Sequence, residues 1–466
     1  MLSILLLGLL FSMGECAPEQ VHLAFHGNYS VMNVVWTTFS SDSSTVLYGT
    51  SPNSLKYTVV GTQKAWRTGS ITRYSHRALM DGLQPSTQYW YKIGSRTFQF
   101  KTLPADPKSY KVCIFGDLGY YHGNSTASIL RNGLAGKFDF VVHVGDISYD
   151  LHTDDGRRGD KFMNEFEPLL SRIPYMVVAG NHENDGENFT NFQERFWMPH
   201  NGYHDNQFYS FDLGPVHWVA LSTEYYGFYT TVGKGPVLTQ YSWLNNDLAA
   251  SFLYNAENLS MNFLNLATNK KSASANRHKT PWIVSYLHRP FYCSAASSDD
   301  CSSYDNSLIR VGYEDIPGLE YPFLKYGVDL GFWGHMHFYE RFYPVANKQY
   351  WSSANCYHNA PAPTYVLTGS AGCHTPNTPF DASPVPFSAK RLNQYGYTVL
   401  TVANSTHIHI EQISIDLDEA VVDDFWLSKD PGFVATDEMR AKRPGAVFPT
   451  TPAALQSESW ELSVGF

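Results

Sequence analysis

The sequence predicts two domains of different fold class, an all-β domain at the N-terminus and a larger α/β domain after it. Residues 18–104 alternate short strand patterns with turns and show no helical period. From residue 110 onward, short apolar runs alternate with loops and with segments of helical spacing, which is typical of an α/β sheet. A chain of 466 residues is also too long for one ordinary core, so more than one domain is expected.

In the all-β region, residues 34–37 (VVWT) are expected to form a strand with a core tryptophan. Residues 83–91 (LQPSTQYWY) have the pattern of a tyrosine corner before a late strand. The region therefore resembles a fibronectin type III-like sandwich, although a less regular β-meander would give a similar pattern. Two prolines within 101–108 indicate a linker.

In the α/β region, periodicity predicts the elements in order. Expected strands are 112–115, 138–144, 175–179, 281–287, 328–333, 364–368, 396–402 and 408–414, with a hairpin at 208–211 and 216–221. The hairpin should open a second sheet that the last three strands complete. Expected helices are 125–135 (with Asn124 as N-cap), 160–172, 240–253 and one near 313–326, and 255–279 is an expected loop.

Polar residues gather directly after five of these strands. Loops at the carboxyl ends of neighbouring strands meet at one edge of an α/β sheet, so these residues are expected to lie together. The segments are 116–119 (GDLG), 145–149 (GDISY), 180–183 (GNHE), 288–290 (HRP) and 334–337 (GHMH).

These segments hold the donors of a metal site. Carboxylates and an amide oxygen suit hard cations, imidazoles suit Zn, Fe or Mn, and no thiolate is among them. The donors are too many for one tetrahedral ion and enough for two ions that share a carboxylate. Because two such ions activate water and clamp an in-line displacement at phosphorus, the residues predict a dinuclear phosphoesterase.

The order and spelling of the five motifs resemble those of the calcineurin-like metallophosphoesterases, and the tyrosine of GDISY points within them to the purple acid phosphatases. The resemblance is greatest to the animal long-form (type 7) acid phosphatases and extends to Trp426. It implies a catalytic α/β domain of two packed mixed β-sheets flanked by helices. The implied organisation is a signal peptide (1–17), a fibronectin type III-like sandwich (18–104), a metallophosphoesterase domain (105–430) and a C-terminal tail (431–466).

The resemblance also implies a role for each donor. Tyr149 would bind as a tyrosinate, which favours the highly charged Fe(III) ion. The expected ligands are Asp117, Asp146, Tyr149 and His337 for Fe(III) and Asn181, His288 and His335 for a divalent Zn, Fe or Mn ion, with Asp146 bridging. His182 would bind phosphate or protonate the leaving alkoxide. Its alternative role is to orient a ligand.

The expected activity is that of a secreted acid phosphatase, in which a metal-bound hydroxide attacks phosphate monoesters of small molecules or proteins. A net charge of −10 argues against nucleic acid or an anionic membrane as partner. The apolar run 2–11 followed by small residues indicates export, rather than a buried strand, with a lysosomal destination left open. The sequence leaves the oligomeric state open.

Cysteines and sequons agree with an oxidising compartment. Cys113 is expected as a buried thiol, and Cys293–Cys301 and Cys356–Cys373 as disulfides, one of three possible pairings. Candidate glycosylation sites are Asn28, Asn124, Asn188, Asn258 and Asn404.

Two other functions fit parts of the pattern. The same ligands can serve a phosphodiesterase or nucleotide pyrophosphatase, which would prefer bis-esters. A secreted binding protein with an inactive phosphatase fold is the second alternative. The full set of seven ligands argues against it, because an inactive site has no need of them.

Overall fold

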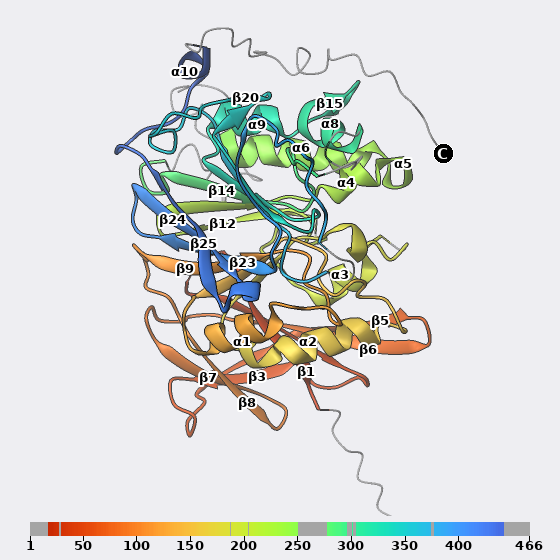
Figure 1. Cartoon of the computed structure of the whole chain (residues 1–466). Helices are drawn as coiled ribbons and strands as arrows, with labels where there is room; N and C mark the ends of the chain where they lie inside the picture. Colours follow the sequence, from red (N-terminus) through yellow and green to blue (C-terminus); the bar gives the residue numbers. More distant parts are fainter. Residues whose placement is uncertain are drawn as a thin grey trace, which may run out of the picture.

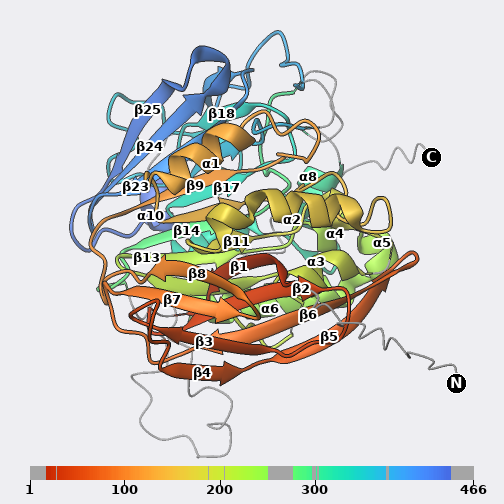
Figure 2. The same cartoon turned by 90° about the horizontal axis from the view of Figure 1, so that it is seen from below.

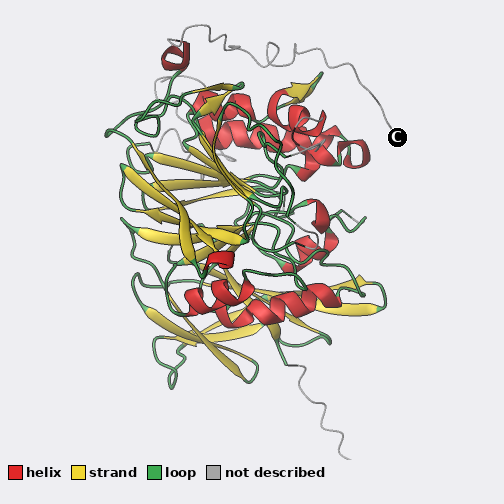
Figure 3. Cartoon of the chain, in the orientation of Figure 1, coloured by secondary structure: helices red, strands yellow, loops and turns green. Residues whose placement is uncertain are grey.

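The computed structural model describes residues 17–27, 29–186, 188–203, 205–249, 277–295, 301, 304–373 and 377–441. A β-sandwich is followed by an α/β domain of two packed sheets (Figure 1). Helices α1 and α2 lie between the sandwich and the first sheet, and α4, α6 and α9 cover the second sheet. Figure 3 shows the strands in layers, with helices between the sandwich and the first sheet and further helices over the second sheet. The predicted fold class is confirmed.

The sandwich consists of two antiparallel four-stranded sheets, ordered β1-β2-β6-β5 and β4-β3-β7-β8. Trp36 lies in its core, as predicted. The backbone N–H of Gln84 donates to the hydroxyl of Tyr89 at 2.9 Å, which confirms the tyrosine corner. The strands are β1 (Glu19–Phe25), β2 (Met32–Thr38), β3 (Thr45–Gly49), β4 (Tyr57–Val60), β5 (Thr62–Thr68), β6 (Ile71–Met80), β7 (Gln88–Ile93) and β8 (Arg96–Lys101).

The first sheet of the α/β domain has six strands and is mixed. Its parallel part, β11-β10-β9, continues into an antiparallel part, β23-β24-β25. The strands are β9 (Tyr110–Phe115), β10 (Phe140–His143), β11 (Tyr175–Val177), β23 (Gly396–Val402), β24 (His407–Ser414) and β25 (Ala420–Ser428).

The second sheet has seven strands in the order β12-β13-β14-β17-β21-β18-β22. It packs on the first through aromatic side chains: Phe140 and Trp218 lie edge to face at 5.5 Å, and the Trp218 indole donates to Tyr110. The strands are β12 (Tyr209–Leu213), β13 (Val216–Ala220), β14 (Trp282–Tyr286), β17 (Leu330–Trp333), β18 (Tyr339–Phe342), β21 (Thr364–Thr368) and β22 (Ser388–Leu392). Two short pairs accompany them, β15 (Gly312–Tyr313) with β16 (Ile316–Pro317) and β19 (Val345–Ala346) with β20 (Gln349–Tyr350).

Helices follow the predicted apolar spacing. In α2, the apolar residues Phe162, Met163, Phe166 and Leu169 are all buried. The N-cap of α1 is Ser125 rather than Asn124. The helices are α1 (Thr126–Leu134), α2 (Arg157–Leu170), α3 (Thr190–Arg195), α4 (Glu224–Gly227), α5 (Tyr229–Val232), α6 (Lys234–Ala249), α8 (Tyr304–Val311), α9 (Glu320–Tyr326) and α10 (Asp437–Ala441), with short 3₁₀ turns η1 (Asn181–Glu183) and η2 (Ile415–Leu417).

Two expected placements of elements are wrong. Strands β23 and β24 belong to the first sheet, since Thr398 pairs with Ile114 of β9. Without them, the apolar strand β9 would be left as an open edge. The helix expected near 313–326 is confined to α9, because β15 and β16 pair in its first half and Pro317 and Gly318 interrupt a helix there. Most of the expected loop 255–279 lies outside the described residues.

Two of the three predictions for cysteines are confirmed, and the third is wrong. Cys293 and Cys301 form the predicted disulfide, and Cys113 is a buried thiol. The predicted Cys356–Cys373 disulfide is not formed. The backbone N–H of Cys373 donates to the Leu118 carbonyl, just past the carboxyl end of β9. Tyr357, next to Cys356, instead accepts the N–H of Ser428, which the strand register places near the amino end of β9.

Candidate metal centre

The predicted ligands all lie in loops at the carboxyl ends of strands in the two packed sheets. Asp117, Asp146 and Asn181 follow β9, β10 and β11, which are parallel neighbours in the first sheet. His288 and His335 follow β14 and β17, which are parallel neighbours in the second. The packing of the sheets therefore brings both groups to one place.

Three of these side chains form a first cluster. The Tyr149 hydroxyl lies 2.8 Å from His337 Nε2 and 3.2 Å from Asp117 Oδ1. His337 Nε2 is 3.6 Å from the same Asp117 oxygen. Asp117 and Tyr149 are buried. This cluster corresponds to three of the four residues expected to hold Fe(III).

The expected ligands of the divalent ion form a second cluster. Asn181 Oδ1 lies 2.9 Å from His335 Nδ1 and 3.1 Å from His288 Nε2. Asp146 Oδ1 is 3.4 Å from His288 Nε2, and ligand atoms of Asp146, His288 and His335 all lie within 4.8 Å of one another. The backbone N–H of His335 also donates to Asp117 Oδ2 at 2.8 Å, which connects the two clusters.

Close backbone packing around the donors explains the glycines of the motifs. A Cβ on Gly180 would lie 2.3 Å from Asp146 Oδ1, and one on Gly334 would lie 2.4 Å from Asp117 Oδ2. The ligands Asp117, Asp146 and His335 themselves adopt left-handed backbone angles, with φ of 58°, 52° and 72°. Such strain is typical of functional sites, where the surrounding structure holds it in place.

The electrostatics of the two clusters favour a bound cation. Burial raises the pKa of Asp117 well above its usual range, and the neighbouring Asp146 raises it further. Burial and both carboxylates raise the pKa of the Tyr149 phenol in the same way. The negative charges of two buried carboxylates and of an ionised phenol would be stabilised by a cation bound between them. The His288 Nδ1 donates to the Val144 carbonyl at 2.8 Å, which leaves Nε2 as a lone-pair donor.

His182 lies at the edge of the clusters and is held by Asp150. Its Nδ1 is 2.6 Å from Asp150 Oδ1, and its backbone N–H donates to Asp146 Oδ1 at 3.0 Å. Its ring meets that of Tyr149 edge to face at 4.6 Å. Burial lowers the pKa of His182, but the hydrogen bond to Asp150 and the charge of Asp146 outweigh it and raise the pKa to about 9. A partly exposed, protonated imidazole beside the clusters can act as a proton donor.

Sequence reasoning missed two carboxylates. The motifs assign no role to Asp150, and Glu183 appears in them only as the last residue of GNHE. The buried Glu183 carboxylate accepts the backbone N–H groups of Asp146 at 2.8 Å, Ile147 at 2.9 Å and Gly180 at 2.8 Å. Each missed residue directly follows a predicted one, Tyr149 or His182, and that adjacency was the available indication.

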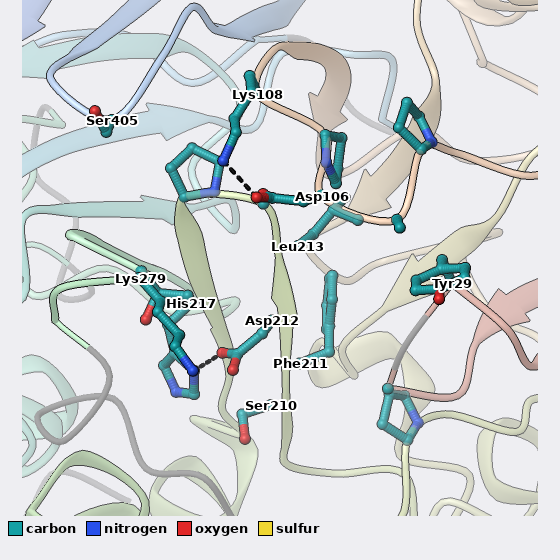
Figure 4. Close-up of a pocket in the computed structure, with 18 of the residues that line it drawn as sticks. Tyr29, Asp106, Lys108, Ser210, Phe211, Asp212, Leu213, His217, Lys279 and Ser405 are labelled. Atoms are coloured by element: carbon teal, nitrogen blue, oxygen red, sulfur yellow. Dashed lines mark hydrogen bonds and ion pairs between the residues drawn. The ribbon is translucent and has the colours of Figure 1, made fainter. Parts of the chain in front are cut away.

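The other histidines that the structure describes have different surroundings. His143 is buried in β10, and its Nδ1 lies 2.7 Å from the Tyr175 hydroxyl. His122 is exposed in a loop, and His204 and His374 lie outside the described residues. His217 borders a cleft of about 1340 Å³ between the linker and the β12–β13 hairpin (Figure 4). None of the predicted ligands lines this cleft, so it is not the metal centre.

The fold and the clusters define a calcineurin-like phosphoesterase, and residues 110–339 match the model of that family. Residues 18–102 match the N-terminal domain of purple acid phosphatases, and residues 362–424 match the iron/zinc purple acid phosphatase-like protein C model. The chain belongs to the purple acid phosphatase family.

Its relatives agree with this. Acid phosphatase type 7 of Homo sapiens is 40% identical over 440 residues, which cover 90% of this chain and 94% of the human protein. The Fe(3+)-Zn(2+) purple acid phosphatase 12 of Arabidopsis thaliana is 30% identical over 89% of this chain and 85% of its own. The solved purple acid phosphatase PPD1 of Lupinus luteus shares the fold, with a TM-score of 0.70 over 89% of this chain and 75% of the lupin chain at 22% identity.

Proposed function

We propose that the chain hydrolyses phosphate monoesters at a dinuclear centre of Fe(III) and a divalent ion. One observation carries the proposal: seven donor residues from five strand-end loops converge into two clusters in contact with each other. Asp117, Tyr149 and His337 would hold Fe(III), and Asn181, His288 and His335 the divalent ion. Asp146 would bridge them, since it contacts His288 and its charge acts on Tyr149.

The residues fit two cations by their chemistry. Oxygen and imidazole donors dominate, which suits Fe, Zn and Mn. The relative named Fe(3+)-Zn(2+) purple acid phosphatase supports iron with zinc, while iron or manganese at the divalent position would suit the same donors. When bound, the ions would supply a nucleophilic hydroxide at phosphorus and neutralise the charge that develops there.

The remaining chemistry belongs to this chain. The His182 imidazolium, held by Asp150, is placed to donate a proton to the departing alkoxide or a hydrogen bond to the phosphoryl group. Glu183 fixes the loops that carry Asp146 and Asn181, since it accepts N–H groups from both. A relative from Allium cepa is named phosphoenolpyruvate phosphatase, and phosphoenolpyruvate is a phosphate monoester.

We also propose that the protein is exported, with a signal peptide at 1–17, domains at 18–104 and 105–430 and a tail at 431–466. The sequons that the structure describes, Asn124, Asn188 and Asn404, are exposed, which suits glycosylation. The Cys293–Cys301 disulfide suits an oxidising compartment. Within the described residues, none of the helices has the length and hydrophobicity needed to cross a membrane.

The visible absorption spectrum of the metal-replete protein, combined with assays on mono- and bis-esters, tests the proposal. A broad charge-transfer band that Tyr149→Phe abolishes is expected, together with turnover of monoesters in preference to bis-esters. A colourless but active protein would mean that Tyr149 does not bind Fe(III). Only the broader function, that of a phosphoesterase, would then stand. Preference for bis-esters would favour a phosphodiesterase, and metal retention without turnover would favour a binding protein.

A further inference from the structure

The N-terminal sandwich contacts the loop that leads away from the metal centre. Residues 150–156 connect Tyr149 to the start of α2 at Arg157. The Ser70 hydroxyl, in the turn between β5 and β6, donates to Asp155 Oδ2 at 2.6 Å. Arg73 of β6 donates from Nη2 to the Asp155 carbonyl at 2.8 Å. Two sandwich residues thus hold a loop whose first residue binds His182.

Arg73 anchors this contact from a buried position. Its guanidinium is fully buried and pairs with the Asp160 carboxylate in the first turn of α2, from Nε at 2.9 Å and Nη2 at 2.6 Å. Arg195, at the end of α3, donates to the same carboxylate at 2.8 Å and to the Gly156 carbonyl at 2.8 Å. Both guanidinium groups lie over the Trp66 ring, at 5.4 Å and 5.1 Å. Figure 2 shows α2 lying against the sandwich.

The loop needs such support because its backbone is strained. Asp154, Asp155 and Gly156 are successive residues with left-handed φ of 56°, 55° and 84°. The turn is closed by hydrogen bonds from Thr153 N–H to the Asp150 carbonyl at 3.2 Å and from Gly156 N–H to the His152 carbonyl at 2.9 Å. A side chain on Gly156 would meet the Arg73 guanidinium at 2.8 Å. Displacement of Asp155 would therefore be passed along a short, closed turn to Asp150.

We propose that Arg73 is a positioning residue of the phosphatase, through which the N-terminal sandwich fixes the 150–156 loop and thereby the Asp150–His182 pair and Tyr149. The inference rests on the proposed function. The sandwich would then act on turnover without contacting the substrate. Its effect would be transmitted from Arg73 and Ser70 through Asp155 to Asp150.

The same interface supplies a matched control. Arg96 of β8 pairs with Glu167 of α2, with Nη1 at 3.0 Å from Oε2. Glu167 lies eleven residues along the chain from Gly156, about 16 Å away at the rise of an α-helix. Arg96→Gln therefore removes an ion pair between the sandwich and the same helix, α2, without touching the 150–156 loop.

The experiment compares full-length, metal-replete wild type with Arg73→Gln, Arg73→Lys and Arg96→Gln by kcat, KM, the charge-transfer band and thermal unfolding. Arg73→Gln is expected to lower kcat about tenfold or more, with a smaller change in KM, and to alter the band. Arg73→Lys should recover part of kcat, because one ammonium can replace only one of the contacts. Arg96→Gln should lower the unfolding temperature but keep kcat and the band.

Unchanged kcat and band in Arg73→Gln would overturn the inference, as would an equal loss of kcat in Arg96→Gln. Should Arg73→Gln fail to fold, Ser70→Ala takes its place. It removes only the hydroxyl contact to Asp155 and is expected to lower kcat severalfold at an unchanged unfolding temperature. An unchanged kcat in Ser70→Ala would then overturn the inference. Wild type without turnover would instead defeat the proposed function, so the two failures are distinguishable.

Discussion

The Glu183 carboxylate accepts the backbone N–H of Asp146 at 2.8 Å, which ties the loop after β11 to the loop after β10. The same carboxylate accepts the N–H groups of Ile147 and Gly180, so one buried side chain satisfies three backbone donors. Burial raises the pKa of Glu183 to about 8, and the charge of Asp146 adds to the effect. This carboxylate therefore sets where Asp146 and Asn181 stand relative to each other.

Glu183→Gln is expected to weaken retention of the divalent ion by about tenfold or more. Glutamine has only one acceptor oxygen, and its NH₂ group would face a backbone donor, at a cost of about 1–3 kcal/mol in the free energy of unfolding. Metal content after dialysis and thermal unfolding measure the two effects. Glu165→Gln, on the exposed face of α2, is the control and should change neither. Full metal content in Glu183→Gln would contradict the assigned role.

His182→Ala is expected to lower kcat in a way that depends on the leaving group. Loss of a general acid costs about 100-fold or more for an alkyl phosphate, whose alkoxide needs a proton, and much less for 4-nitrophenyl phosphate, whose phenolate leaves unaided. Steady-state kinetics on both esters measure the ratio. His122→Ala, in an exposed loop, should leave both rates unchanged. An equal loss on both substrates would mean that His182 only orients a ligand.

Asp150→Asn is expected to move the basic limb of the kcat profile to lower pH. The Asp150 carboxylate raises the pKa of His182, so its neutralisation lets the imidazolium lose its proton at lower pH. The limb should move by about one pH unit or more, while the acidic limb stays in place. Asp139→Asn, whose carboxylate accepts only the backbone N–H of Lys111 at the far end of the sheet, is the control. An unmoved basic limb would show that another group limits the rate there.

The sequence could predict that the donor residues lie together, because their positions follow from strand periodicity. Asp117 and Asp146 directly follow apolar runs, and parallel neighbours end at the same edge. It could not predict the Asp150–His182 contact, since the loop that carries Asp150 bends through a left-handed turn at Asp154 and Asp155, and Arg73 of the other domain contacts that turn. Local pattern carries no information on such contacts between distant segments.

The prediction that placed β23 and β24 in the second sheet is wrong for a related reason. The pattern of residues 396–402 predicts a strand there, but the choice of β9 as its partner depends on tertiary packing. Likewise, the spacing of Cys356 and Cys373 in the sequence allows a short disulfide loop. In the structure β21 lies between them in the chain, and no disulfide joins them. In both cases the elements were predictable and their partners were not.

His217 is expected to make stability depend on pH at a place far from the metal centre. Its ring lies between two carboxylates, with Nδ1 at 2.6 Å from Asp212 and Nε2 at 2.9 Å from Asp247. Burial lowers its pKa, but the two carboxylates outweigh burial and raise the pKa from 6.5 to about 9. The imidazolium is thus favoured in the folded state, so its contribution is fully present below pH 6.5 and is lost as the pH rises through 9.

Denaturant unfolding of wild type and His217→Asn between pH 6 and pH 10 measures this contribution. The gap in the free energy of unfolding between the two proteins should be larger at pH 6 than at pH 10, by about 3 kcal/mol. His407→Asn, at the exposed start of β24, is the control, and its gap to wild type should stay constant across the range. A constant gap for His217→Asn as well would mean that the ring is neutral in the folded protein and that Asp212 or Asp247 carries the proton instead.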